Sequence, residues 1–206
     1  MGAKRVILWR HGTTDFNTEG RIQGASDVPL NATGREEARL AAAQLAKRFI
    51  PLSIVSSDLG RARETAQALA NLVDVEVTVD ERLRERAFGK LEGLTAKEMR
   101  RDYPDFYERW RSTGECPVAG IEMRRTVGKR VSEGIIDAAA HAEGGRTLVV
   151  VSHGSALTQG LVTLLGLDPS AWAGIRGLDN GHWAEILTAD RAPKWRISTY
   201  NAGVKG

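Results

Sequence analysis

The sequence predicts an α/β protein: a three-layer sandwich with a mostly parallel central sheet, one antiparallel edge and a helical cap insertion. Two patterns support this fold class. Short apolar runs that suit buried strands alternate with longer alanine-rich or amphipathic segments that suit helices. Near the end of the chain, two segments of alternating apolar and polar residues flank a short turn, which is typical of an antiparallel hairpin.

The first part of the chain is expected to contain short, apolar strands at residues 6–9, 52–57 and 75–79. Helices are expected between them, over residues 33–48 and 59–72. Asn31 or Thr33 can cap the first helix, and Asp58 can cap the second, because their side-chain oxygens accept hydrogen bonds from free backbone N–H groups.

The second part continues the alternation. Its expected helices span residues 95–110, about 123–141 and 155–167, and its expected strands span residues 146–152, 182–189 and 194–200. Pro104 should break or shift the first of these helices. No linker divides the chain, so we expect one domain over residues 1–206, with residues from about 86 to 145 forming a mainly helical cap region beside the sheet.

The composition is that of an ordinary globular domain, with 206 residues of which 42% are apolar and 27% are charged. The 29 basic and 26 acidic residues are intermixed and give a net charge of +3, so we expect no nucleic-acid partner. The apolar runs are too short for a signal peptide or a membrane span, and the single Cys116 allows no internal disulfide. We therefore expect a cytoplasmic protein with no membrane partner, and an exposed edge strand would allow a homodimer.

Three of the expected strands end in residues that suit an anion site. The motifs are Arg10–His11–Gly12, Ser56–Ser57–Asp58 with Arg61 shortly after it, and Ser152–His153–Gly154. A lone histidine or arginine in such a place is more often structural than catalytic. In open α/β sheets, however, ligands bind beyond the carboxyl ends of the parallel strands, where helix N-termini also favour anions. If these strands are neighbours, the three motifs form one anion-binding crevice.

These motifs also carry a resemblance to a known family. The segments are RHGTTDFN at 10–17, GRIQG at 20–24, SSDLGRARETA at 56–66, LRERAFGKLEG at 83–93 and VVSHGSAL at 150–157. Together they resemble the histidine phosphatase superfamily, which includes the cofactor-dependent phosphoglycerate mutases. The resemblance spans nearly the whole chain, and it implies an α/β sandwich that forms a phosphohistidine intermediate without a metal.

The resemblance implies a catalytic role for five residues. His11 matches the nucleophile, Arg10 the arginine beside it, and Arg61 the phosphate-binding arginine. Glu85 matches the general acid, and His153 matches the second histidine of the pocket. Without the motif, Glu85 would be taken for a surface carboxylate in a charged run.

Other matching positions are expected to contact the substrate or its phosphate, in addition to Arg10 and Arg61: Thr14, Asn17, Gln23, Gly24 and Gly154. Arg63 falls on a variable position and is expected at the surface. Thr13 departs from the glutamate that many relatives have there, which affects the expected substrate preference rather than the reaction.

The chemistry explains why these residue types are needed. Arg10 and Arg61 can neutralise a phosphate and hold its oxygens through paired hydrogen bonds, which allows a neutral His11 to attack the phosphorus. Glu85 must arrive protonated so that it can donate to the leaving oxygen. Because alternate side chains of an extended segment point to opposite faces, the neighbours Arg84 and Arg86 should face away from Glu85.

No metal and no cofactor are expected, because the four histidines lie far apart in sequence and the chain has no GxxxxGK[ST] phosphate loop. His182 and the tryptophans Trp172, Trp183 and Trp195 are expected to be structural, although the segment around His182 can approach the pocket. The expected partner is a small phosphorylated metabolite.

Three functions remain open at this stage: a phosphatase, a cofactor-dependent phosphoglycerate mutase that returns the phosphoryl group to its substrate, or a non-catalytic binding module. The chain is compact for a mutase, and the module would be expected to lack one of the catalytic residues. Segments 177–187 and 194–203 resemble those of phosphatases that act on glucosyl-3-phosphoglycerate, but another sugar phosphate or a phosphoglycerate remains an alternative substrate. Cap residues that can contact the leaving group, or else pack on the sheet, are Arg100, Arg101, Tyr103, Tyr107, Trp110 and Arg111.

Overall fold

A computed structural model describes residues 2–50 and 52–204 of the chain. Its strands are β1 (Arg5–Arg10), β2 (Leu52–Ser56), β3 (Val77–Val79), β4 (Thr147–Ser152), β5 (Trp183–Thr188) and β6 (Trp195–Ala202). They form one sheet in the order β3-β2-β4-β1-β5-β6, in which β1 to β4 pair in parallel and β5 runs antiparallel to both of its neighbours, β1 and β6. The predicted mostly parallel sheet with one antiparallel edge is confirmed.

The register of the central strands brings their carboxyl ends together. All six residues of β4 are buried, as expected for a strand covered on both faces. At its end, Ser152 lies opposite Arg10 of β1, while Val151 lies opposite Ser56 of β2. The histidine motifs that follow β1 and β4 therefore start side by side, with the serine–aspartate motif that follows β2 next to them.

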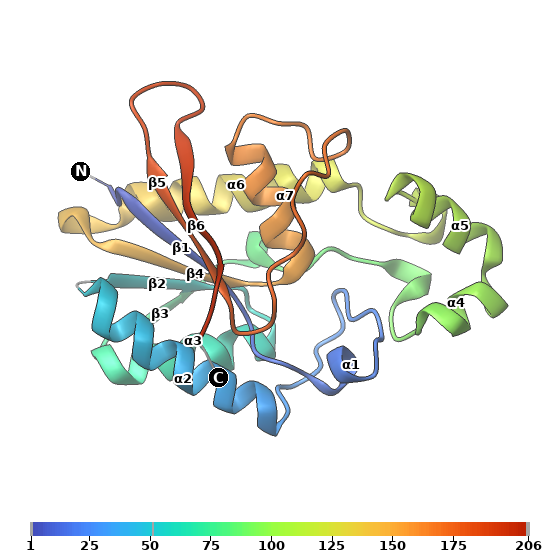
Figure 1. Ribbon diagram of the computed structural model, residues 1–206, viewed down its shortest axis with the longest axis horizontal. Coiled ribbons are helices and arrows are strands. Elements are labelled where there is room, and N and C mark those ends of the chain that lie inside the picture. The colour runs from blue at the N-terminus through green and yellow to red at the C-terminus, as the bar shows by residue number, and fades with distance from the viewer. Residues whose placement is uncertain (1, 51, 205–206) are drawn as a thin grey trace.

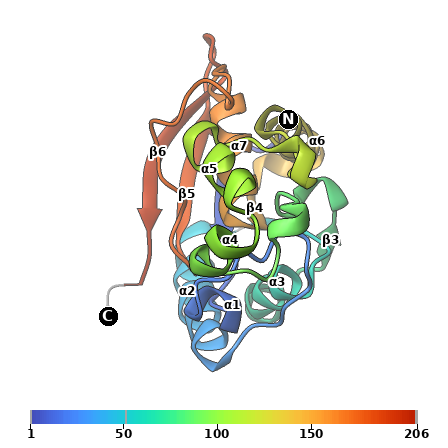
Figure 2. The same ribbon diagram turned by 90° about the vertical axis from the view of Figure 1, so that its right-hand side faces the viewer.

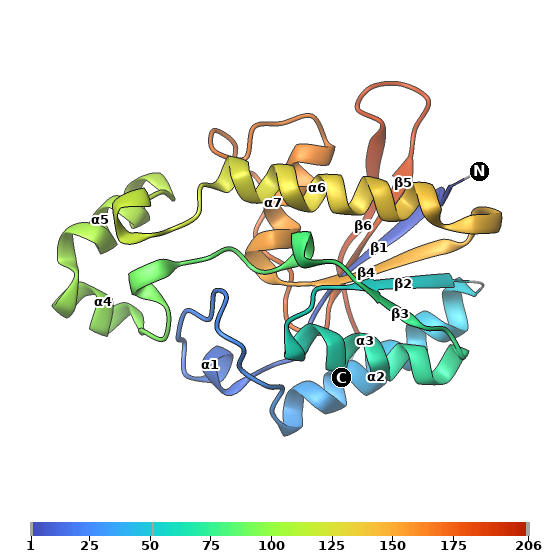
Figure 3. The same ribbon diagram turned by 180° about the vertical axis from the view of Figure 1, so that it is seen from behind.

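Two helical layers enclose this sheet, as Figures 1 and 3 show. The helices α2 (Ala32–Phe49) and α3 (Gly60–Val73) pack against one face, where Ile7 and Val149 lie in the shared core. The helices α6 (Arg124–His141) and α7 (Gly154–Leu164) pack against the other face, around Leu8 and Val150. Neighbouring residues of a strand point to opposite faces, so each central strand contributes to both cores.

The predicted helix caps are only partly correct. Asn31 caps α2 by accepting a hydrogen bond from a backbone N–H in its first turn. The prediction that Asp58 caps α3 is wrong, because its carboxylate is bound by Arg84 at 2.9 Å. The first N–H of that helix, at Gly60, instead donates to Asp27 at 2.7 Å.

A small helical cap extends beyond the carboxyl edge of the sheet, nearest the viewer in Figure 2. It contains α4 (Ala96–Asp102) and α5 (Pro104–Thr113), which meet at the break predicted near Pro104. The cap has a hydrophobic cluster of its own, made of Phe88, Leu91, Met99, Tyr107, Cys116, Ala119 and Ile121. The helix α6 was expected in this region but packs on the sheet, so the part that stands apart is shorter than residues 86–145.

Shorter elements complete the chain: the helix α1 (Asp15–Thr18) and the 3-10 turns η1 (Glu81–Leu83), η2 (Gly89–Leu91), η3 (Pro117–Ala119) and η4 (Glu143–Gly145). Over residues 2–50 and 52–204, each helix is too short or too polar to span a membrane.

Candidate active site

Two buried histidines face each other beyond the ends of β1 and β4. His11 is 2% exposed and His153 is fully buried, and their ring centroids are 5.1 Å apart at an interplanar angle of 59°. Such close burial of two imidazoles is expected only where both stay neutral or where a ligand compensates their polarity. The convergence of strand ends that the sequence predicted is confirmed for these two motifs.

The surroundings of His11 keep one ring nitrogen available for chemistry. Its Nδ1 donates to the carbonyl oxygen of Gly12 at 2.6 Å, so Nε2 carries the lone pair and accepts from Nε of Arg61 at 3.3 Å. Burial, together with the charges of Arg61 and Arg10, holds the pKa of His11 well below its ordinary value. At neutral pH the imidazole is therefore uncharged, and its Nε2 lone pair is available.

Arg61 is a fully buried cation that backbone carbonyls hold in place. Its guanidinium donates to the carbonyl oxygens of Gly24 at 2.9 Å and Ser26 at 2.7 Å. Gly24 has a φ of +56°, and a Cβ atom there would overlap the carboxylate of Glu92 at 2.2 Å. The sequence motif at 20–24 thus serves to position Arg61, whereas Arg63 is exposed as predicted.

Arg10 and His153 each leave a buried nitrogen without a partner in the part of the chain that the structure describes. Arg10 donates through Nη1 to the carbonyl oxygen of Leu178 at 2.6 Å, but its Nε is buried and unpaired. The side chain lies against Gly154, where an added Cβ would be 3.3 Å from its Cζ.

The unpaired nitrogen of His153 is Nδ1. The other ring nitrogen, Nε2, lies 2.9 Å from the hydroxyl oxygen of Ser57, and that oxygen already accepts from the N–H of Leu59. Ser57 can therefore donate its own proton to Nε2, which leaves Nδ1 protonated. Buried donors without partners are costly, so these two N–H groups mark a place for an anion.

Glu85 lies at the N-terminus of α7, close to His153 in the fold. Its carboxylate accepts hydrogen bonds from the backbone N–H groups of Ala156 at 2.8 Å, Ser155 at 3.1 Å and Arg86 at 2.8 Å. The charge of Glu85 also raises the pKa of Arg10 and Arg61 against the lowering effect of their burial. This carboxylate is thus within electrostatic reach of both arginines.

The neighbours of Glu85 face away from it, as predicted. Arg84 pairs with Asp58, and Arg86 pairs with Glu115 at 2.8 Å. Arg130 of α6 supports the same segment from behind, because its guanidinium donates to the backbone carbonyl of Glu85 at 3.1 Å. Nothing in the sequence pattern distinguishes Arg130 from other surface arginines of an amphipathic helix.

The remaining predicted site residues fall into two groups. Gln23 is mostly buried and its Oε1 has no partner among residues 2–50 and 52–204, so it is available to a ligand. Thr14 is fully buried, and its hydroxyl caps α1 through a reciprocal pair of hydrogen bonds with Asn17. That pair occupies the amide oxygen of Asn17, which leaves the amide nitrogen for the site.

Asn180 is a site residue that sequence reasoning missed. Its amide nitrogen donates to the carbonyl oxygens of His11 at 3.1 Å and Gly12 at 3.3 Å, and to Oδ1 of Asn17 at 3.1 Å. It therefore fixes the loop that carries His11. The nearby histidine of the segment, His182, contacts the backbone of Asn180 rather than the pocket.

A cavity of about 410 Å³ adjoins the candidate active site between the cap and the start of α7. Gly154 and Ser155 belong to its wall, as do Trp110 and Arg111 from the cap residues predicted to contact a leaving group. Arg101 instead pairs with Asp102 at the surface.

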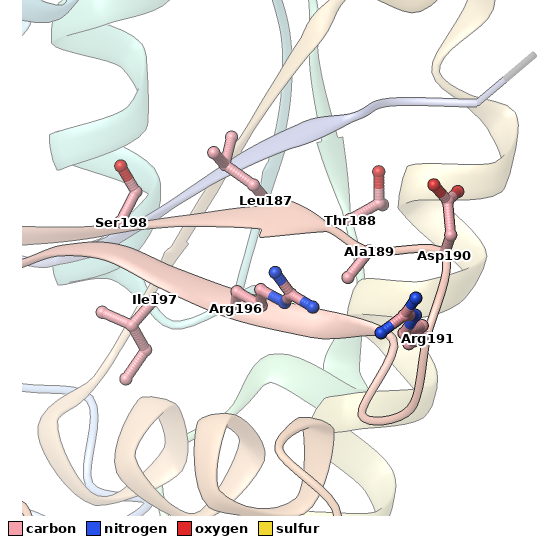
Figure 4. Close-up of a pocket in the computed structure, with 8 residues that line it drawn as sticks. All are labelled: Leu187, Thr188, Ala189, Asp190, Arg191, Arg196, Ile197 and Ser198. Carbon is pink, nitrogen blue, oxygen red and sulfur yellow. The ribbon is translucent and has the colours of Figure 1, made fainter.

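A larger hollow of about 650 Å³ lies elsewhere, along the hairpin of β5 and β6, and Figure 4 shows the eight residues that line it. Leu187 of this hollow pairs with Arg5 at the amino end of β1, whereas the histidines follow the carboxyl end. The hairpin hollow thus lies at the opposite end of the sheet from the two histidines. Across residues 2–50 and 52–204, no three His, Cys, Asp or Glu side chains are grouped as metal ligands would be.

The sequence of this chain is similar to those of known phosphatases and mutases. Residues 6–202 match the family model of the histidine phosphatase superfamily (branch 1). Glucosyl-3-phosphoglycerate phosphatase of Mycolicibacterium vanbaalenii is 34% identical over 220 residues, covering 100% of this chain and 97% of that protein. Probable phosphoglycerate mutase GpmB of Serratia proteamaculans is 39% identical over 173 residues, covering 79% of this chain and 75% of that protein.

A solved structure has the same architecture. It is that of mycobacterial glucosyl-3-phosphoglycerate phosphatase in complex with inorganic phosphate, which matches with a TM-score of 0.85 and 34% identity. The match covers 98% of each chain.

Proposed function

The chain belongs to branch 1 of the histidine phosphatase superfamily, and on that premise we propose that it hydrolyses a small phosphomonoester through a phosphohistidine on His11. The observation that carries this proposal is the buried, neutral His11, whose Nε2 faces Arg61. A structural histidine would not need two arginines in a buried site with unpaired nitrogen donors around it.

Binding of the phosphate comes first in the proposed reaction. The phosphate oxygens accept hydrogen bonds from Nε of Arg10 and Nδ1 of His153, the two donors that lack partners in the described part of the chain. Arg61 turns its Nε–H from His11 to a phosphate oxygen, which frees the lone pair of His11 for attack. Preorganised donors of this kind typically contribute about 2.7–4 kcal/mol each to the transition state.

Transfer of the phosphoryl group follows. Nε2 of His11 attacks phosphorus in line with the ester oxygen, so a P–N bond forms as the P–O bond breaks. Because Nδ1 of His11 donates to Gly12, the positive charge that develops on the ring is shared with a backbone carbonyl. Asn180 keeps that loop fixed while the bond forms.

Glu85 supplies a proton to the leaving group and later accepts one from the attacking water. A protonated Glu85 donates to the leaving oxygen, and the ionised carboxylate that results is stabilised by the three N–H groups around it. That carboxylate then accepts a proton from the water that attacks phosphohistidine. Inorganic phosphate and free His11 are the products of this second step.

Hydrolysis is favoured over mutase chemistry by the extent of the similarity. The phosphatase from Mycolicibacterium matches over 100% of this chain, whereas the probable mutase matches over 79%. We therefore propose that the substrate is 3-phosphoglycerate or a derivative of it that keeps the phosphomonoester, with glucosyl-3-phosphoglycerate as the first candidate. The presence of all five residues of the catalytic set disfavours a non-catalytic module: His11, Arg10, Arg61, Glu85 and His153.

We also propose that the reaction needs no metal and takes place in the cytoplasm, where the buried thiol of Cys116 would stay reduced. The exposed edge of β6 favours a homodimer, which light scattering would test.

The experiment that tests the proposed function is release of inorganic phosphate from a panel of sugar phosphates, phosphoglycerates, nucleotides and phosphoamino acids, with a chelator present. His11→Ala should lower the rate on the order of 10⁴-fold or more, since the nucleophile is lost. His141→Ala is the matched control, because His141 lies exposed at the end of α6. Substantial turnover by the His11→Ala protein, or inhibition by chelator that added metal reverses, would contradict the proposal.

A further inference from the structure

The cavity beside the reaction site begins where the leaving group must depart. Ser155 lines it and donates its N–H to Glu85, the proposed proton donor, and Gly154 lines it next to Arg10. The opposite wall comes from the cap, where Phe88 and Trp110 pack edge to face with ring centroids 6.0 Å apart. An ester whose phosphate lies on His11 would therefore extend its alcohol portion into this cavity.

The lining of the cavity is strongly cationic. Its charged members are Arg86, Arg111 and Arg124, and none of its lining residues in the described part of the chain has a carboxylate side chain. Such a lining favours a leaving group that carries negative charge of its own.

Arg86 is already neutralised within the protein. It is 3% exposed and bound to Glu115 at 2.8 Å, and it also donates to the carbonyl oxygens of Glu122 at 2.6 Å and Gly114 at 2.8 Å. It has few donors left for a ligand, so its function in the cavity wall is structural.

Arg124, unlike Arg86, is not neutralised by a carboxylate in the described part of the chain. Its side chain has no ion pair or hydrogen bond in the part of the chain that the structure describes, and its Nε is buried without a partner. The neighbouring charge of Arg124 also lowers the pKa of Arg86, so the two cations repel each other. Arg111 likewise makes no ion pair there, but it is exposed on α5.

We propose that Arg124 is the specificity-determining residue of this enzyme and that it binds a carboxylate on the leaving group of the substrate. A planar guanidinium with unpaired donors is suited to bidentate binding of a carboxylate. Trp110 and Phe88 cover the carbon skeleton between the carboxylate and the ester oxygen. This inference rests on the proposed function, because it takes the phosphate position from the site around His11.

The test compares two ligands that differ at one group. 3-Phosphoglycerate has a carboxylate where glycerol 3-phosphate has a hydroxymethyl group, and their phosphates are alike. Calorimetry on the His11→Ala protein measures binding of both without turnover. We expect 3-phosphoglycerate to bind on the order of 10- to 100-fold more tightly, as one charge-assisted contact allows. In the same background Arg124→Gln should reduce that ratio to within a few-fold, and Arg124→Lys should retain part of it.

Arg125→Gln is the matched control, since Arg125 is the next residue of α6 but is exposed and pairs with Asp168 outside the cavity. It should leave the ratio unchanged. Equal binding of the two ligands by the His11→Ala protein, or an undiminished ratio after Arg124→Gln, would overturn the inference.

Turnover by the unmodified enzyme separates this inference from the proposed function. Phosphate release from both esters at equal efficiency would contradict the role of Arg124 and leave hydrolysis standing. An intact binding preference with no phosphate release from any ester would support the role of Arg124 and contradict hydrolysis.

Discussion

On the sheet side of the candidate site, Arg61 is buried and Arg10 is half-buried, and both are bound to backbone carbonyls. On the cap side, Arg111 and Arg124 have no ion pair in the described part of the chain, and the surrounding wall is partly exposed. Arg10 ends β1 and Arg61 begins α3, and both elements belong to the main sandwich. Arg111 lies on α5 of the cap, and Arg124 is the first residue of α6. Both pairs are cationic, but only the first is held rigidly.

This difference separates two tasks. Rigid donors stabilise a transition state best, because they need no rearrangement as charge moves, so the sheet side suits the phosphoryl transfer. A looser wall adapts to the shape and charge of the alcohol portion, so the cap side suits substrate choice. We therefore expect substitutions on the sheet side to lower the rate for every ester, and substitutions on the cap side to change the order of preference among esters.

The largest effect after loss of the nucleophile is expected for Glu85→Gln. It should lower phosphate release from an alkyl ester by about 10²- to 10⁴-fold, the range for a lost general acid. With p-nitrophenyl phosphate, whose leaving group departs without a proton, the first turnover should stay fast and give a burst of nitrophenol before slow steady-state release. Stopped-flow absorbance measures the burst, and equal losses for both esters without a burst would contradict the role of Glu85 as acid.

A somewhat smaller effect is expected for Arg61→Ala, about 10²- to 10³-fold in kcat/KM for all esters alike. The reason is that Arg61 contacts His11 and, in the proposed reaction, also binds the phosphate. Arg63→Ala is the control on the same helix and should have almost no effect, because Arg63 is exposed. Steady-state kinetics on a sugar phosphate and a phosphoglycerate would show the pattern. A change in the ratio of kcat/KM between the two esters would contradict the proposal that the sheet side sets the rate and the cap side sets the preference among esters.

Asn180→Ala should lower kcat by about 10-fold with little change in KM, since a loosened loop misplaces His11 but removes no phosphate contact. Asn71→Ala, at an exposed position of α3, is the matched control. A rise in KM with unchanged kcat would instead make Asn180 a binding residue.

The smallest effect is a dependence of stability on pH. The pKa of His153 in the folded protein lies well below its ordinary value of 6.5, chiefly because of burial. Below pH 6.5 the unfolded chain therefore binds more protons, and the free energy of unfolding falls as the pH falls. Urea denaturation at pH 7 and pH 5.5 should show this loss, and His153→Asn should reduce it by about 1 kcal/mol. His141→Asn should not, because His141 is exposed.

Much of the fold was predictable because its signals are local. The apolar runs before Arg10 and Ser152 identify buried strands, and the residues that follow them identify the site. The layer to which α6 belongs was not predictable, since an amphipathic pattern shows that a helix has an apolar face without showing what covers it.

The supporting residues of the candidate site were harder to predict than the residues of the sequence motifs. Asn180 reaches the loop after His11 only because β5 pairs with β1, with Trp183 opposite Trp9. Arg124 combines a buried Nε with a side chain that has no hydrogen-bond partner in the described part of the chain, and this combination depends on where every nearby acceptor lies. Neither property leaves a periodic or spacing signal in the sequence.

The most direct test of the central claim is detection of the phosphoenzyme. The enzyme is mixed with substrate, quenched in alkali to preserve a P–N bond, digested, and analysed by mass spectrometry. We predict one phosphorylated peptide, with the phosphoryl group on His11, and its loss in the His11→Ala protein. Phosphate on another residue such as His153, or turnover without any phosphoenzyme, would contradict the assignment of His11 as the nucleophile.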